Sequence, residues 1–317
     1  MYNTMVSIVC LAYNHEKYIK KALDGFINQK TNFPFEVIVH DDASTDKTTD
    51  IIREYEKKYP GIIKGIYQTE NQYSKKIKIT RRIVLPKVKS KYIAFCEGDD
   101  YWNDNNKLQM QYDILEANPN YSMCTHGIIR IKENGDYVSE DLGEEKAYSF
   151  EDILFENSPT MHTSSRLIRR DIYASMPEFM TNAPVGDGPM LTWSSMKGDI
   201  YYIDKAMSSY RIFSSSSWSK RILIDKKLAS EQLEGINRYL KELDEFTDFK
   251  YSVEINKKID YNNFFFYFYH VFNYKNAKRT NSYKRQSLKN KIIINIGCIL
   301  PGFINHVRKL KNKDRYN

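Results

Sequence analysis

Residues 92–100 read YIAFCEGDD, and this stretch decides the fold. An apolar run leads into Glu97, Asp99 and Asp100, so a buried strand is predicted to carry three carboxylates at its carboxyl end. These side chains repel one another unless a cation lies among them. A divalent cation that carries a phosphate ligand suits the cluster, because hard cations take carboxylate oxygens. An acidic turn that simply ends the strand is the alternative.

Strands and helices alternate on the N-terminal side of this stretch. A continuous apolar run predicts a strand at residues 6–12, and short segments rich in apolar residues predict strands at 35–40 and 62–67. Between them, apolar residues at helical spacing predict helices at 17–29 and 47–58. The alternation predicts βαβ units and a parallel, doubly wound α/β sheet.

Polar groups follow three of these strands. They are Tyr13 to Glu16 after the first strand, Asp41 and Asp42 after the second, and the acidic cluster after the fourth. Ligands of doubly wound sheets bind at the carboxyl ends of the strands, so we expect these groups to converge on one edge. The sequence carries neither a GxGxxG nor a GxxxxGK[ST] signature, which disfavours dinucleotide oxidoreductases and P-loop enzymes.

The second half of the chain changes character near residue 223. Before this point, apolar patterns predict helices at 107–118 and 190–196 and strands at 121–126, 160–168, 200–203 and 207–210. After it, long amphipathic patterns predict helices at 224–243 and 251–275. We therefore divide the chain into a domain at 1–222 and a helical, basic and aromatic region at 223–317.

Composition sets broad limits. The chain has 317 residues and a net charge of +8, which suits anionic partners but also a plain lysine-rich surface. Four cysteines at unpaired spacings are predicted to be free thiols in a reducing compartment. We expect no secretory signal peptide, because the first four residues lead directly into a strand.

The stretches at the strand ends carry a resemblance. The chain resembles the family-2 glycosyltransferases of the GT-A fold, in the bacterial branch that makes surface polysaccharides. The matching stretches are 6–19, 40–48 and 92–102, with a later echo at 186–189 and 209–211. The resemblance covers roughly residues 4–220. It implies a Rossmann-like, mostly parallel sheet flanked by helices, to which the C-terminal region adds a helical appendage.

The resemblance implies a donor site. Tyr13 corresponds to the residue that lies against the nucleotide base, and Asp42, with Asp41 behind it, to the residue that hydrogen-bonds the uracil or ribose. Arg81 or Arg82 corresponds to a basic residue that meets the nucleotide, although a solvated basic helix explains both equally well. The full set of implied donor-binding residues is Leu11, Ala12, Tyr13, Glu16, Asp41, Asp42, Arg82, Glu97, Gly98 and Arg211.

The resemblance also implies a metal site and a catalytic base. Asp99 or Asp100 is the expected ligand of Mn²⁺ or Mg²⁺, with Asp99 preferred. Glu97 stands where the family has the first Asp of its Asp-x-Asp motif, and this departure leaves its role open. Asp187 corresponds to the base that takes the proton of the acceptor hydroxyl. Its alternative is a helix N-cap, since an Asp at a helix start often has that role.

Other polar residues receive weaker predictions. Tyr210 and Arg211 resemble a Tyr-Arg-x-His motif, but Phe213 occupies the His position, so a metal contact there is in doubt. Residues 214–218 are expected to form a flexible loop over the donor. His126 and His162 are predicted to be hydrogen-bonded structural residues rather than catalytic ones.

The C-terminal region contains an apolar segment at 292–304 between clusters of Lys and Arg. This segment is too short to cross a bilayer. Such a pattern fits association in the plane of an anionic membrane surface. A helical appendage that packs on the catalytic domain, with a solvated basic tail, fits equally well.

The sequence thus predicts a metal-dependent inverting glycosyltransferase. It moves a sugar from a nucleotide-sugar donor, expected to be a UDP-sugar, to a capsular, O-antigen or related surface glycan, free or lipid-linked. We expect it in the cytoplasm, at the inner face of the membrane if the C-terminal region binds there, and we expect no nucleic-acid partner. The alternatives are a sugar nucleotidyltransferase and a non-catalytic nucleotide or nucleic-acid binder.

Overall fold

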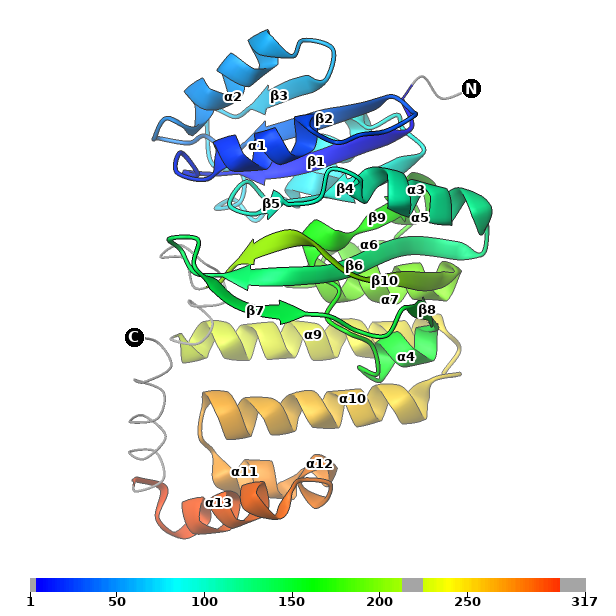
Figure 1. The fold of residues 1–317 in the computed structure, drawn as a ribbon. Coiled ribbons are helices and arrows are strands. Elements are labelled where there is room, and N and C mark those ends of the chain that lie inside the picture. Colours follow the sequence, from blue (N-terminus) through cyan, green and yellow to red (C-terminus); the bar gives the residue numbers. More distant parts are fainter. Residues whose placement is uncertain (1–3, 213–224, 303–317) are drawn as a thin grey trace. The chain divides into compact units, whose positions relative to one another are not determined.

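The protein is described by a computed structural model, which covers residues 4–212 and 225–302 (Figure 1). The described residues fall into two compact units. The first holds residues 4–182 and 186–212, and the second holds 183–185 and 225–302. The predicted boundary at 222/223 lies outside the described residues.

A ten-stranded mixed sheet forms the first unit, in the order β3-β2-β1-β4-β9-β6-β10-β5, with β7 paired to β6 and β8 to β10. Its first four strands run parallel, and their side chains are mostly buried, as apolar runs at these positions predict. Their bounds are β1 Val6–Ala12, β2 Phe35–Asp41, β3 Ile63–Tyr67 and β4 Tyr92–Phe95.

The other half of the sheet is built around two long strands, β6 (Tyr121–Ile131) and β10 (Asp199–Arg211), which pair in parallel. The short strand β9 (Leu167–Arg169) runs antiparallel to both β4 and β6 and so joins the two halves. The edges carry β5 Tyr101–Trp102, β7 Tyr137–Asp141 and β8 Lys146–Tyr148.

Two strand predictions in this half need correction. The predicted strand at 160–168 is only β9 at its end, because the preceding residues form a loop with a 3₁₀ turn at Thr163–Ser165. The predicted strands at 200–203 and 207–210 are one strand, β10. Its register shifts between Ile203 and Ser208, and this irregularity interrupts the apolar alternation that marks a continuous strand.

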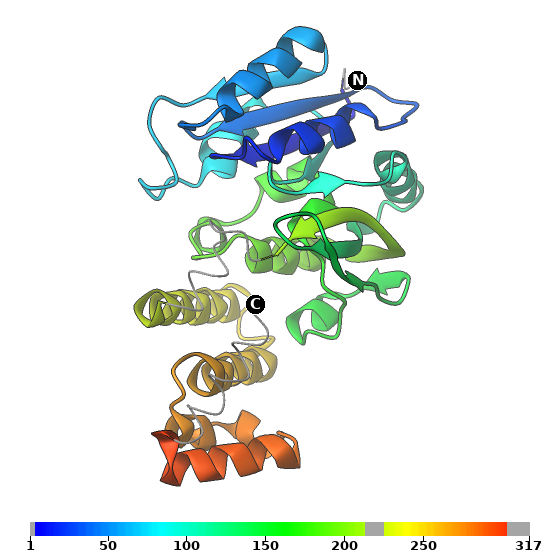
Figure 2. The same cartoon turned by 60° about the vertical axis from the view of Figure 1, so that its left-hand side comes forward.

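Helices cover this sheet. The helices α1 and α2 pack side by side next to β1, β2 and β3, as both views show (Figures 1 and 2). A mixed π and 3₁₀ segment spans Thr80–Val84 and Leu85–Lys87, and it contains Arg81 and Arg82. The α-helices are α1 Ile19–Ile27, α2 Thr48–Lys58, α3 Lys107–Ala117, α4 Phe150–Leu154, α5 Arg170–Ala174, α6 Glu178–Thr181 and α7 Asp187–Lys197. The predicted α/β class is confirmed.

A lysine lies in the core beneath this sheet. Lys107, at the start of α3, is fully buried, its Nζ donates to Oε1 of Gln111 at 2.7 Å, and it stands 3.9 Å from the ring centre of Trp102. Burial lowers the pKa of Lys107 to about 7. The unfolded chain keeps an ordinary lysine pKa near 10.4, so it holds a proton that the folded chain has lost at alkaline pH.

We therefore predict that Lys107→Met changes how stability depends on pH. In the wild type, the free energy of unfolding rises with pH between about 8 and 10 by about 1.4 kcal/mol per unit from this lysine, because only the unfolded state still binds the proton. The variant lacks this contribution. Urea unfolding at several pH values measures the two slopes, and Lys89→Met, at an exposed position, is the control. Equal slopes for wild type and Lys107→Met would refute a buried, neutral lysine.

The described part of the second unit is helical. It contains α9 Lys226–Phe246, α10 Ser252–Phe265, a π turn at Phe266–His270, α11 Tyr274–Arg279, α12 Asn281–Lys284 and α13 Leu288–Ile299. A small core joins the last helices through Phe264, Phe268, Tyr274, Ala277 and Ile294. Within 4–212 and 225–302, the structure has no helix with the length and apolar character needed to cross a membrane.

The predicted helix at 251–275 is broken in this unit. α10 ends at Phe265, the π turn follows, and Phe272 takes a left-handed backbone conformation with φ of 53°. Asn273 then caps α11, because its side chain accepts the backbone N–H of Asn276 at 3.1 Å. The sequence does not reveal this break, because the dense aromatic run continues from the end of α10 into the π turn.

Candidate active site

The three carboxylates after β4 converge on one point. One oxygen each from Glu97, Asp99 and Asp100 lies within 4.8 Å of the others. Asp100 is buried, and its Oδ2 has no hydrogen-bond partner among the described residues. A buried, unpartnered carboxylate oxygen is costly unless a cation meets it. The donor set therefore fits a hard divalent cation.

The protonation of this cluster supports the same reading. Loss of hydration raises the pKa of Glu97 to about 8, and the charges of Asp99 and Asp187 add to the effect. Burial, with the charges of Asp99 and Glu97, also holds the pKa of Asp100 well above its usual range. The protein alone thus does not stabilise three ionised carboxylates here, and a bound cation would.

Arg211, the last residue of β10, holds the acidic motif in place through hydrogen bonds. Its backbone N–H donates to Oδ1 of Asp100 at 2.9 Å, and its Nε donates to the carbonyl of Asp99 at 3.1 Å. Its Nη1 donates to the carbonyls of Lys132 and Glu133 at 3.0 and 2.7 Å. The guanidinium is buried and engaged with backbone oxygens, so the structure shows a supporting role for a residue predicted to bind the donor.

The loops after β1 and β2 are joined to each other by hydrogen bonds beside the acidic cluster. Asn14 donates its backbone N–H to Oγ of Ser44 at 2.9 Å and accepts the N–H of Thr45 at 2.8 Å. Two residues on, Glu16 accepts the N–H of Lys47 at 3.1 Å. Asn14 and Ala43 hold left-handed conformations, with φ of 56° and 63°. These bonds hold the predicted Tyr13-to-Glu16 turn in one geometry.

Gly98 fits this arrangement because there is no room for a side chain. A Cβ at this position would lie 2.8 Å from Nδ1 of His15 and 2.9 Å from Cδ1 of Ile19. The backbone N–H of Gly98 donates to the carbonyl of Leu11 at 2.9 Å, which ties the motif to the end of β1. The structure thus brings together Leu11, Ala12 and Gly98 at the strand ends, as predicted for one sheet edge.

Asp41 and Asp42 are buried and have partners within the chain. Asp42 accepts the backbone N–H groups of Gln72 and Tyr73 at 2.7 and 3.0 Å. Asp41 accepts the N–H of Ser44 at 3.2 Å and the hydroxyl of Thr49. Each carboxylate keeps lone pairs beyond these bonds. Tyr13 differs, because its side chain is 45% exposed at the end of β1 and offers a free aromatic face.

Asp187 begins α7, and its carboxylate does not cap that helix. The N-cap is Gly186, without a side-chain hydrogen bond. Oδ1 of Asp187 instead accepts the hydroxyl of Thr163 at 2.7 Å and Nη1 of Arg166 at 3.0 Å, and the side chain remains 64% exposed. The alternative in which Asp187 only caps α7 is therefore wrong.

The charge state of Asp187 follows from these contacts. The cation of Arg166 and the hydrogen bond from Thr163 lower the pKa of Asp187 below its usual range. An accessible carboxylate that stays ionised is able to accept a proton. Its charge also raises the pKa of Glu97, so the two acidic groups act on each other electrostatically.

Arg166 is a site residue that the sequence reasoning missed. Its side chain is 2% exposed, and its Nε and Nη2 donate to the carbonyl of Met161 at 3.1 and 2.7 Å, which leaves Nη1 for Asp187. A buried guanidinium needs an anion. The sequence signal for a buried arginine was its position directly before the apolar pair Leu167 and Ile168.

His162 lies beside the acidic cluster and is hydrogen-bonded, as predicted, because its Nδ1 is 2.9 Å from Oγ of Ser164. Its Nδ1 is 4.0 Å from Oδ2 of Asp100, and its ring centre is 3.9 Å from that of Tyr210. Burial lowers the pKa of His162 to about 4, so the ring is neutral. His126, by contrast, is buried elsewhere and donates Nδ1–H to the carbonyl of Gly127 at 2.7 Å, as a structural residue does.

Two predicted residues, Arg81 and Arg82, are not brought to the acidic cluster by any described contact. Arg82 is exposed and pairs with Glu178 at 3.1 Å. Arg81 donates to the carbonyls of Tyr173 and Met176 at 2.8 and 3.1 Å. Phe213 and the predicted loop at 214–218 lie outside the described residues.

Comparison with known proteins agrees with this geometry. The model of the family described as "Glycosyl transferase family 2" matches residues 7–176. An uncharacterised protein of Mycobacterium tuberculosis is 35% identical over 215 residues, which is 67% of this chain and 60% of that protein, so the chain spans less than two thirds of this relative. The putative teichuronic acid biosynthesis glycosyltransferase TuaG of Bacillus subtilis is 25% identical, over 70% of this chain and 85% of its own length.

Solved structures show the same fold. Residues 1–349 of S. aureus TarS, in complex with UDP, superpose with a TM-score of 0.58 at 17% identity, over 91% of this chain and 77% of that one. The mannosyltransferase PcManGT of Pyrobaculum calidifontis, in complex with GDP-Man and Mn²⁺, gives 0.59 at 15% identity, over 95% and 81%. These neighbours confirm the predicted GT-A fold. With the family model matching more than half of its residues, the chain belongs to glycosyl transferase family 2.

Proposed function

We propose that this protein is a metal-dependent inverting glycosyltransferase that uses a UDP-sugar and extends a surface glycan. One observation carries the proposal. The acidic cluster with its unpartnered Asp100 oxygen and the ionised, accessible Asp187 lie close enough to affect each other's charge, yet Asp187 has its own cationic partner. Group transfer needs this separation between leaving-group activation and proton removal.

The acidic cluster serves the leaving group in this proposal. Asp99 and Asp100, with Glu97 beside them, would hold Mn²⁺ or Mg²⁺, which supplies a Lewis acid for the diphosphate of the donor. Arg211 keeps both aspartates in place through its bonds to Asp100 Oδ1 and the Asp99 carbonyl. The binding of UDP by TarS and of GDP-Man with Mn²⁺ by PcManGT supports a nucleotide donor and a divalent ion.

Asp187 serves the acceptor. Its carboxylate takes the proton from the acceptor hydroxyl as that oxygen attacks the anomeric carbon on the face opposite the leaving diphosphate, and the configuration inverts. Arg166 and Thr163 hold Oδ1, so the other oxygen of the carboxylate is the proton acceptor. The neutral ring of His162, whose Nδ1 lies 4.0 Å from Oδ2 of Asp100, adds no charge to the site.

The nucleoside binds at the ends of β1 and β2. The exposed ring of Tyr13 stacks on the base. Asp42 accepts a hydrogen bond from the base or the ribose, and the backbone N–H of Gln72 holds its carboxylate in position. The role of the relative TuaG in teichuronic acid biosynthesis supports an acceptor that belongs to the cell surface. An acceptor carried on a lipid would place the protein in the cytoplasm, at the inner face of the membrane.

A screen of nucleotide sugars tests this proposal. Purified protein is incubated with each UDP-, GDP-, CMP- and dTDP-sugar, and the released nucleotide is measured with Mn²⁺ and with chelator. We expect Mn²⁺-dependent release of UDP from one UDP-sugar. Release of GDP instead would show that the donor is a GDP-sugar. Release of pyrophosphate from a nucleoside triphosphate and a sugar phosphate would identify a nucleotidyltransferase.

A further inference from the structure

We propose that the exposed face of α13 docks in the plane of an anionic membrane surface. This helix presents a row of large apolar side chains to solvent, which a water-soluble surface helix normally lacks. Their exposed fractions are 76% for Leu288, 49% for Ile292, 39% for Ile296, 78% for Ile299 and 57% for Leu300. The inference uses only the second unit and does not depend on the proposed activity.

Helical geometry makes these side chains one stripe. At about 100° per residue, Leu288, Ile299, Ile292 and Ile296 lie within an arc of about 80°. The opposite face is already used, because Ile294 and Gly297 are buried against α11, and a Cβ at Gly297 would meet the ring of Tyr274 at 2.5 Å. The stripe is therefore an outer face with no partner in the small core of this unit.

The charges around the stripe indicate what covers it. At the same spacing, Lys289 and Lys291 flank the stripe on its two sides. Residues 261–302 contain seven Lys or Arg and no Asp or Glu. An apolar stripe between cations is the pattern of helices that lie at the boundary of lipid headgroups and acyl chains. Each such cation strengthens binding to an anionic surface.

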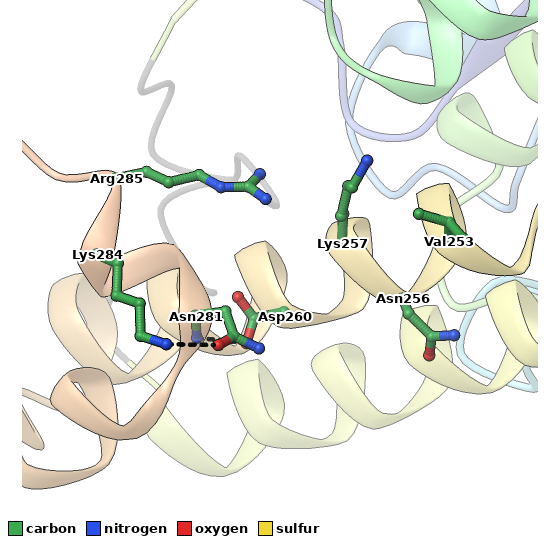
Figure 3. A pocket seen from close by; sticks show the side chains of 7 residues that line it. All are labelled: Val253, Asn256, Lys257, Asp260, Asn281, Lys284 and Arg285. Carbon is green, nitrogen blue, oxygen red and sulfur yellow. Dashed lines mark hydrogen bonds between the residues drawn. The ribbon is translucent and has the colours of Figure 1, made fainter.

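A nearby hollow adds to the positive field. It has a volume of about 440 Å³ and lies between α10 and α12, where it is lined by Lys257, Lys284 and Arg285 (Figure 3). The one acid that lines it, Asp260, already accepts the backbone N–H groups of Asn281 and Ser282 at 2.9 and 2.6 Å. Arg285, the residue after α12, leads within three positions to Leu288, the first residue of the stripe.

A second copy of this chain fits the stripe less well. A symmetric contact through α13 would bring Lys289 and Lys291 of both copies together, and the flanking segments hold no acid to balance them. A lipid surface that contains phosphatidylglycerol or a similar anion supplies both the apolar phase and the negative charge. The charge distribution thus favours the membrane.

Vesicle flotation of the full chain tests the proposal. We expect binding to phosphatidylcholine vesicles that contain phosphatidylglycerol, much weaker binding to phosphatidylcholine alone, and loss of binding at high salt. The double variant Ile292→Ser, Ile299→Ser should lower the partition coefficient roughly a hundredfold, because two large apolar side chains are removed. Val138→Ser, at an exposed position on β7, is the matched control and should bind as the wild type does.

A charge variant and a sedimentation run separate the other outcomes. Lys289→Gln with Lys291→Gln should weaken binding to the anionic vesicles about tenfold and reduce its salt dependence. Vesicle binding that the serine variant leaves unchanged would overturn the proposal. So would a stable dimer in analytical ultracentrifugation that the serine variant dissociates, since the stripe would then meet a second copy. Circular dichroism checks that each variant is folded. Donor turnover is measured without vesicles, so a failure of vesicle binding does not bear on the proposed transferase activity.

Discussion

Asp187→Asn is expected to abolish sugar transfer while the protein still binds its donor nucleotide. The amide keeps the shape of the side chain and can still accept from Thr163, but it cannot take a proton. General bases contribute roughly 10²–10⁴-fold to enzymatic rates, so kcat should fall by about a thousandfold. Steady-state kinetics gives kcat, and titration with UDP gives the binding constant, which should stay near the wild-type value.

The matched control for this prediction is Asp171→Asn. Asp171 is another aspartate of the first unit with an arginine partner, Arg170 at 2.8 Å, but it lies on α5 and is exposed. It should keep wild-type kcat. If Asp187→Asn retained most of its transfer activity and folded normally, the base would have to be another group, and the proposed mechanism would be wrong.

A pH profile distinguishes a base from a residue that only holds the site together. The pKa of Asp187 is lowered, so the acid limb of kcat/KM in the wild type should lie at or below the usual range of an aspartate. Thr163→Val removes the hydrogen bond of 2.7 Å to Oδ1 and should move this limb to higher pH. A uniform loss of activity, without a shift of the limb, would point to a structural effect.

Removal of the divalent cation should have the second large effect. Chelation of the metal ions is expected to stop donor turnover, and Asp99→Asn should lower kcat/KM by roughly a hundredfold or more, since metal ions supply several kcal/mol of charge stabilisation at a transferring group. The reason lies in the donor set, in which Asp99 is one of three oxygens that meet within 4.8 Å. Neutralising one of them weakens the affinity for a hard cation.

Calorimetric titration of UDP with and without Mn²⁺ measures this effect directly. In the wild type, Mn²⁺ should tighten UDP binding, and in Asp99→Asn most of that gain should vanish. Asp113→Asn, at an exposed position on α3, keeps the chain's net charge equal to that of the test variant and should behave as the wild type does. Equal affinity for UDP in the presence and absence of Mn²⁺ would contradict a metal role for the cluster.

The parallel half of the sheet could be read from the sequence because its signal is local. The strands β1, β2 and β3 are short segments rich in apolar residues, and the structure places them within one residue of their predicted bounds. The region before β9 failed for the opposite reason. There the polar groups of residues 160–166 bond to one another and to Asp187, so their conformation depends on partners distant in the chain.

The site divides in the same way. Glu97, Asp99 and Asp100 are adjacent in sequence, so their proximity needed no knowledge of the fold. Arg166 pairs with an aspartate 21 positions later, and its importance arises only because α7 returns to the loop before β9. His162 meets Asp100 across 62 positions in the same manner. Sequence patterns reveal clusters that are continuous along the chain and miss those that folding assembles.

The hydrogen bonds between the loops after β1 and β2 have a consequence for the thermodynamics of donor binding. Asn14, Glu16 and Asp42 already bond to backbone N–H groups of neighbouring loops. Most of the conformational entropy of these segments is therefore lost when the chain folds rather than when the nucleotide arrives. Preorganised sites of this kind bind with little ordering cost. The chain's own hydrogen bonds, and not only its contacts with the donor, thus set the affinity of this sheet edge for a nucleotide.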